Sequence, residues 1–89
     1  MQNLNYNILK SIVSQDGKTV FFLSSAEITI EETTAVTYNI SAADCCHITT
    51  VEDTSTNRDL CENILNELYA KSISYENLKE FISEYLSEH

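Results

Sequence analysis

Hydrophobic and polar residues alternate through the first half of the chain, which is the pattern of half-buried β-strands. Residues 6–13 and 19–30 are rich in valine, isoleucine, threonine and aromatic side chains, the types that suit a pleated surface. Residues 34–40 continue the alternation, and residues 47–51 form a weaker fourth run. These runs predict a meander of three or four antiparallel strands within residues 1–52.

A tight turn between the first two strands sets the expected register. Asp16 and Gly17 are good candidates for the positive-φ centre of a two-residue hairpin turn. Such a turn places Val13 opposite Val20, and the other pairs follow from it. Both faces of the hairpin are then apolar: Leu9, Val13, Val20, Phe22, Ala26 and Ile28 line one, and Ile8, Ile12, Phe21 and Leu23 line the other, interrupted by Lys10.

The second half of the chain changes to helical spacing. Apolar residues recur every three or four positions in residues 56–70 and 74–88, which predicts two amphipathic helices. Thr56 and Ser74 stand where the N-caps of these helices are expected. The short connection makes the helices antiparallel neighbours. The predicted fold is a single α+β domain over residues 1–89, a small antiparallel β-meander of three to four strands followed by two antiparallel α-helices packed on one face.

Two short helices cover only one face of a sheet, so one apolar face is left without a cover. We expect the uncovered patch to consist of Ile8, Ile12, Phe21 and Leu23, with a protein partner packed on it. A homodimer is the simplest form of this prediction, because two-fold assemblies are the commonest oligomers. An alternative stays open, in which curling of the strands or the N-terminal segment covers the same residues.

Composition and charge restrict the function of such a domain. Its 89 residues form a shallow core with little room for a walled catalytic pocket, so we expect no enzyme activity. Fourteen acidic and five basic residues give a net charge of −9, which disfavours direct binding to nucleic acids or anionic membranes. The first seven residues lack the basic cluster of a signal peptide, and no apolar run approaches the length of a membrane span. Three cysteines without a secretory signal fit free thiols, so we expect a cytoplasmic protein.

Residues 38–40, 51–57 and 77–86 contain a tyrosine-asparagine pair, an acidic-serine helix entry and an acidic amphipathic final helix. In these features the chain resembles a family of short, uncharacterised bacterial proteins from anaerobic Gram-positive species, classified only as a domain of unknown function. Asn39 departs from the glycine that is common in similar sequences, and Tyr75 departs from a frequent proline. Asparagine tolerates positive φ better than most residues, so the first change is mild. The resemblance implies an architecture and brings no known activity, cofactor or partner.

The run Cys45, Cys46 and His47, with Cys61 downstream, contains the usual ligands of zinc. Adjacent cysteines point to opposite sides of an extended chain, and the run lacks the two-residue spacer that brings zinc ligands together. Cys45 and His47 share a face of a strand and would suit a thiolate–imidazolium pair, but no orienting residue accompanies them. We therefore expect small, partly buried thiols here, with no metal ligand, no catalytic residue and no cofactor.

The last predicted helix carries Glu76, Glu80, Glu84 and Glu88 at intervals of four residues, which form an acidic ridge with a rise of about 6 Å per step. That rise is close to the phosphate spacing of a nucleic-acid strand, so the ridge suits a nucleic-acid mimic that inhibits a DNA- or RNA-binding protein. The simpler interpretation is a solubilising face. The function expected from the sequence is a small acidic protein-interaction or regulatory domain without catalysis, with the mimic as the alternative.

Overall fold

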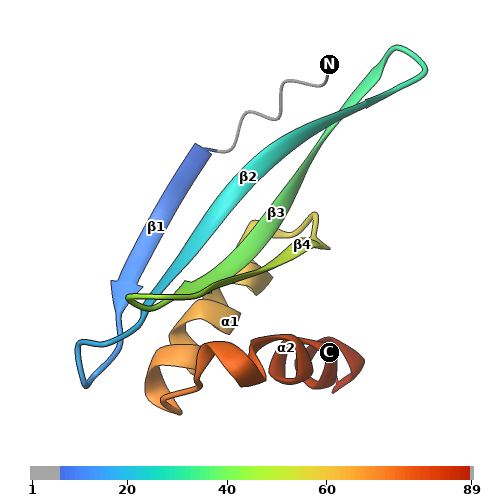
Figure 1. Cartoon of the computed structure of the whole chain (residues 1–89). Helices are drawn as coiled ribbons and strands as arrows, with labels where there is room; N and C mark the ends of the chain where they lie inside the picture. Colours follow the sequence, from blue (N-terminus) through green and yellow to red (C-terminus); the bar gives the residue numbers. More distant parts are fainter. Residues whose placement is uncertain (1–6, 89) are drawn as a thin grey trace.

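The computed structural model describes residues 7–88, with four strands and two α-helices in the order that the sequence predicts. The strands form one antiparallel sheet in the order β1-β2-β3-β4, and both helices lie on the same side of it (Figure 1). The predicted α+β class is therefore confirmed. Tyr6, the predicted start of the first strand, lies outside the described residues. The elements are β1 (Asn7–Val13), β2 (Val20–Ile30), β3 (Thr33–Ala43), β4 (Ile48–Ser55), α1 (Arg58–Ala70), the 3₁₀ helix η1 (Tyr75–Asn77) and α2 (Leu78–Glu88).

The hairpin between β1 and β2 has the predicted register but a different turn. Val13 pairs with Val20, as expected. The Gly17 N–H closes the turn by donating to the Ser14 carbonyl at 2.9 Å, and Gly17 has a φ of 75° while Asp16 does not adopt positive φ. The Asp16 carboxylate instead accepts a hydrogen bond from Ser14 Oγ. The predicted two-residue turn is wrong, while the pairing that it implied is confirmed.

A bulge in β1 exchanges two positions between the faces of the sheet. Ile8 pairs with Ser24 and Lys10 pairs with Leu23, which leaves Leu9 as an extra residue in the ladder. Leu9 packs against the core, whereas Ile8 is 66% exposed. The predicted faces of Ile8 and Leu9 are therefore wrong, because alternation does not reveal where an extra residue interrupts a strand.

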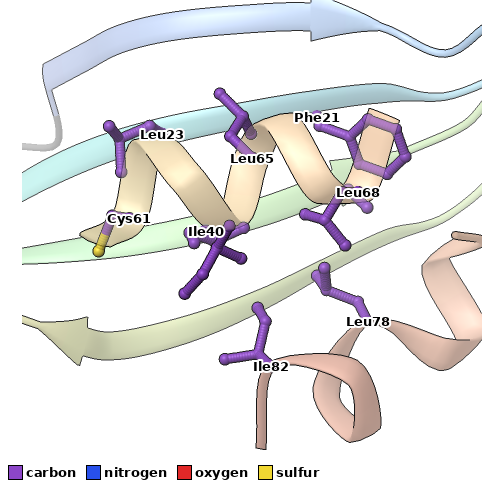
Figure 2. Packing of buried hydrophobic residues seen from close by; sticks show 10 residues of the cluster. Phe21, Leu23, Ile40, Cys61, Leu65, Leu68, Leu78 and Ile82 are labelled. Carbon is purple, nitrogen blue, oxygen red and sulfur yellow. The ribbon is translucent and has the colours of Figure 1, made fainter. Parts of the chain in front are cut away.

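The hydrophobic core lies between the helices and one face of the sheet (Figure 2). Phe21 and Leu23 are fully buried in it, at 0% exposure. They pair with Ala42 and Ile40 of β3, so two adjacent strands present one apolar strip to the helices. Helix α1 packs along this strip, and α2 closes the core beside it. The buried cluster consists of Phe21, Leu23, Ile40, Ala42, Cys61, Ile64, Leu65, Leu68, Leu78 and Ile82.

The prediction that Ile8, Ile12, Phe21 and Leu23 form an uncovered patch is therefore wrong. Phe21 and Leu23 lie beneath the helices, Ile12 is half-buried against the core, and Ile8 is exposed on the opposite side. The reason is the contribution of the next strand along the sheet. β3 adds isoleucine and alanine to the face of Phe21 and Leu23, but it adds serine and asparagine to the other face. The helices pack on the more apolar side.

The helices begin at different residues from those predicted. Asn57 Oδ1 accepts a hydrogen bond from the Leu60 N–H at 3.2 Å, so Asn57 rather than Thr56 is the N-cap of α1. Ser74 precedes η1 rather than an α-helix, and its side chain makes no capping hydrogen bond. Because α2 starts only after η1, Glu76 lies outside it.

β2 and β3 run past the ends of their neighbours and form a two-stranded arm (Figure 1). β1 pairs with β2 no further than Ser25, and β4 pairs with β3 no further than Tyr38. The arm comprises residues 26–37 and ends in the turn Glu31-Glu32, whose φ angles are 48° and 68°. Both faces of the arm therefore extend beyond the helices.

Candidate functional site

The side of the sheet opposite the helices, here called the open face, gathers apolar side chains. In the described part of the chain no helix or strand packs over it (Figure 1). Three of its isoleucines are among the most exposed: Ile8 at 66%, Ile30 at 67% and Ile48 at 65%. Strand pairing assigns to this face six of the eight large hydrophobic side chains that are exposed within residues 7–88: Ile8, Val13, Val20, Ile28, Ile30 and Ile48.

The open face carries little charge, although the chain has a net charge of −9. Within residues 7–88, its charged side chains are Glu52 and Asp53, both in the edge strand β4. The remaining charges of the sheet lie in turns or, like Lys10 and Glu27, on the side of the helices. An acidic protein thus presents one nearly neutral surface, which is typical of the centre of a protein interface.

The middle of the open face is polar and its two ends are apolar. Ser24 and Ser41 are buried there, and Ser41 Oγ lies 2.8 Å from Thr50 Oγ1. With Phe22 and Glu52, these three residues line a shallow groove of about 320 Å³. Five of the six apolar side chains lie on either side of this polar band, towards the β1–β2 and β3–β4 turns in one direction and along the arm in the other. The sixth, Ile8, pairs with Ser24 and lies at the β1 end of the band.

A bulge in β4 borders the polar band. Asp53 has a φ of 52°, and its N–H donates to Asn39 Oδ1 at 2.8 Å while its carboxylate accepts a hydrogen bond from Thr37 Oγ1. Asn39 Nδ2 is buried and makes no hydrogen bond with any of residues 7–88. Asparagine at position 39 would tolerate a positive φ, but the positive φ occurs at Asp53, in the strand that pairs with β3. Asn39 serves to hold the bulge rather than to form a turn.

The cysteines do not assemble a metal site. Cys45 and Cys46 are exposed in the β3–β4 turn with their Sγ atoms 3.3 Å apart, whereas Cys61 is buried in the core. Within residues 7–88 no group of three or more histidine, cysteine, aspartate or glutamate side chains is placed to hold a metal ion. The hydrogen bond with Cys45, partial loss of hydration and the charge of Asp44 raise the pKa of Cys46, which lowers its thiolate fraction.

His47 has a packing contact in place of a thiolate partner. Its ring stacks on Tyr75 of η1 with centroids 4.7 Å apart, and its Nδ1 lies 3.3 Å from Asp44 Oδ1. The Asp44 carboxylate also accepts hydrogen bonds from the N–H groups of Cys46 and His47, and these bonds lower the pKa of Asp44. The contacts tie the β3–β4 turn to the segment that precedes α2.

The acidic ridge is shorter than the sequence predicts. Glu80, Glu84 and Glu88 lie on α2 and are exposed, while Glu76 lies in η1. The four-residue spacing therefore holds as helical geometry for three of the four glutamates. Tyr75, where a proline was expected, is the first residue of η1.

Sequence reasoning missed the residues that complete the open face. Ile30 and Ile48 were not candidate site residues, although both are about two-thirds exposed, at 67% and 65%. Alternation along β2 could have found Ile30, which is in phase with Val20 and Ile28. Ile48 required the pairing of β3 with its neighbours, which continues the face of Val20 through Ala43 to Ile48.

Comparison of the chain with protein-family models, with curated proteins and with solved structures finds no match. The resemblance to the family of uncharacterised bacterial proteins stays a prediction. Within residues 7–88, neither α-helix has the length and apolar character needed to cross a bilayer.

Proposed function

We propose that this chain is a small protein-interaction domain without catalytic activity, and that it binds its partner through the open face of the sheet. The observation that carries the proposal is the gathering of six exposed large hydrophobic side chains on one nearly uncharged surface. Apolar residues scattered over a whole surface are ordinary, but six large ones gathered on one side of a sheet indicate that another surface displaces water there.

The magnitude of the hydrophobic term supports this role. Fully burying an isoleucine or valine side chain contributes about 1.5–3 kcal/mol relative to leaving it in water. In the isolated domain most of this stabilisation is not realised at Ile8, Ile30 and Ile48, because each is about two-thirds exposed. A partner that covers all three gains several kcal/mol before the costs of association are subtracted.

The charge pattern determines where the partner contacts the domain. Turns and helices carry most of the acidic residues, which keep those surfaces hydrated and repel other acidic proteins. The open face lacks this repulsion over its centre and the β1 side, and Glu52 and Asp53 lie at its β4 edge. Charge confined to the rim is usual in protein–protein interfaces.

A cytoplasmic location belongs to the same proposal. Cys45 and Cys46 are free and exposed, and exposed free thiols persist in a reducing compartment. We also propose that the family resemblance and a bacterial source apply to this chain, since the final amphipathic helix on which the resemblance rests is formed as α2.

Site-specific photocrosslinking in cells tests the proposed function. A photoreactive phenylalanine analogue placed at Ile28 on the open face should give a discrete covalent adduct, and the same analogue at the exposed Ser83 of α2 should give none. Adding Ile48→Lys to the Ile28 probe should remove the adduct, because a charge on the apolar face opposes docking. Equal adduct yields from both positions, or no adduct from Ile28, would overturn the proposal.

A nucleic-acid mimic is the second candidate, favoured by the three exposed glutamates Glu80, Glu84 and Glu88 on α2. In this case a basic nucleic-acid-binding protein should co-purify with the domain, free DNA should compete for it, and Glu80→Lys with Glu84→Lys should abolish its capture. Retention by the double variant would exclude the ridge as the contact surface.

A further inference from the structure

We infer that the occupant of the open face is a second copy of this chain, packed sheet against sheet around a two-fold axis; this inference rests on the proposed function. Both helices lie on the far side of the sheet, so neither obstructs the approach of another sheet (Figure 1). Face-to-face packing of two antiparallel sheets, about 10 Å apart, is a standard architecture.

Charge selects this face for self-association. Each copy carries a net charge of −9, so most pairs of surfaces on two copies repel one another. The Debye length at physiological ionic strength is about 8 Å, which does not screen charges that meet in a close contact. When two copies meet through their open faces, the charged side chains that would repel one another are Glu52 and Asp53. Both belong to the edge strand β4.

The arrangement of polar and apolar residues on the open face is self-complementary. Val20 and Ile48 lie at one end, and Ile28 and Ile30 lie at the other. The hydroxyl band with Ser41 crosses the middle, and Ile8 lies at its β1 end. A two-fold rotation places the polar band of one copy on that of its partner, and it places apolar ends on apolar ends. An isologous interface requires this kind of pattern, whereas a patch with one apolar end would not match itself.

The area of the face is sufficient for a dimer. Four strands at about 4.8 Å spacing and about 3.3 Å rise per residue, with β2 and β3 continuing into the arm, give roughly 600 Å² per copy. Two copies would bury about 1,200 Å², which exceeds the roughly 1,000 Å² expected of a specific interface and lies at the small end of the range. Interfaces at the small end of this range are often weak and reversible, so we expect an equilibrium between monomer and dimer.

Sedimentation velocity of the purified 89-residue chain tests the inference. As the protein concentration rises through the micromolar range, the sedimenting mass should increase from the 10.1 kDa monomer to twice that value. Ile28→Lys and Ile48→Lys on the open face should each keep the protein monomeric at every concentration. Ser83→Lys on α2 is the matched control, because it changes the net charge equally and should leave the dimer intact.

Circular dichroism of each variant verifies the fold, since Ile28 and Ile48 are exposed and do not belong to the buried cluster. A protein that stays monomeric throughout overturns the inference, and so does a dimer that survives both open-face substitutions. If the protein is monomeric while the Ile28 probe crosslinks to a different protein in cells, the second copy is wrong and the proposed function stands. If the protein is monomeric and the probe gives no adduct, both are wrong.

Discussion

The turn at the tip of the β2–β3 arm yields the most direct test of the structure. Ile30 pairs with Thr33, so Glu31 and Glu32 form a two-residue turn, and their φ angles of 48° and 68° are both positive. This is the type I′ geometry, which favours asparagine at the first position and glycine at the second. For other residues the left-handed conformation costs about 1–2 kcal/mol each, because Cβ approaches the following carbonyl oxygen.

The expected gain from Glu32→Gly follows from these values. Relief of the left-handed strain contributes about 1–2 kcal/mol. The additional freedom of glycine in the unfolded chain removes about 0.5–1 kcal/mol of that gain. Glu32 is exposed, so its replacement loses no packing. With the middle of each range, the net stabilisation should be about 0.75 kcal/mol, and Glu31→Asn with Glu32→Gly should exceed it.

Urea unfolding followed by circular dichroism measures this gain in the free energy of unfolding. A gain of 1 kcal/mol should also raise the melting temperature by about 4–8 °C in a domain of this size. Glu32→Gln is the control, because it removes the charge and keeps the strained side chain, so it should give little of the gain. The conformational explanation is refuted if Glu32→Gly is neutral or destabilising, or if Glu32→Gln stabilises the domain equally.

Three further outcomes follow from the core and the β3–β4 turn. Leu65→Ala should lower the free energy of unfolding by about 2–5 kcal/mol, because the Leu65 side chain is fully buried between α1 and the sheet. Urea titration measures this loss, and a loss below about 1 kcal/mol contradicts the packing. Burial raises the pKa of Cys61 to about 11. In the folded protein a thiol reagent at neutral pH should therefore label Cys45 and Cys46 alone. Labelling of Cys61 at the same rate contradicts its burial. The pKa of Asp44 is lowered below its ordinary value of 3.8, so its contribution to stability is complete above pH 3.8 and is lost as the pH falls through the pKa of the folded state. The urea midpoints of wild type and Asp44→Ala should therefore converge in acid. A difference between the midpoints that does not change with pH excludes this linkage.

The sequence predicted the type and order of the elements because each has a strong local pattern. The hairpin register was predicted from a two-residue turn at Asp16-Gly17, and it is correct although the turn uses Gly17 alone at positive φ. The bulge at Leu9 was not predictable, since Ile8 and Leu9 are both apolar and either would suit the core. A local pattern predicts that a strand is half-buried, but it does not show on which side of the sheet the core forms.

The candidate site depended on information from several strands at once. Phe21 and Leu23 belong to the core because Ala42 and Ile40 lie beside them, which is a property of β2–β3 pairing. Similarly, Ile48 joins the open face only through its place in the sheet. The prediction that one apolar side stays without helices was sound in its geometry, and the choice of side was wrong.

The separation of charged and neutral surfaces has a consequence for the behaviour of this protein in acid. The segment from Arg58 to Glu88 carries seven acidic and three basic residues, whereas the outer side of the sheet depends on aliphatic groups that do not titrate. Near the isoelectric point, pH 4.3, the helical layers of neighbouring molecules lose their mutual repulsion while the aliphatic side keeps its affinity. Acidification should therefore promote aggregation, because the helical surfaces of neighbouring molecules no longer repel one another and can meet as readily as the aliphatic side.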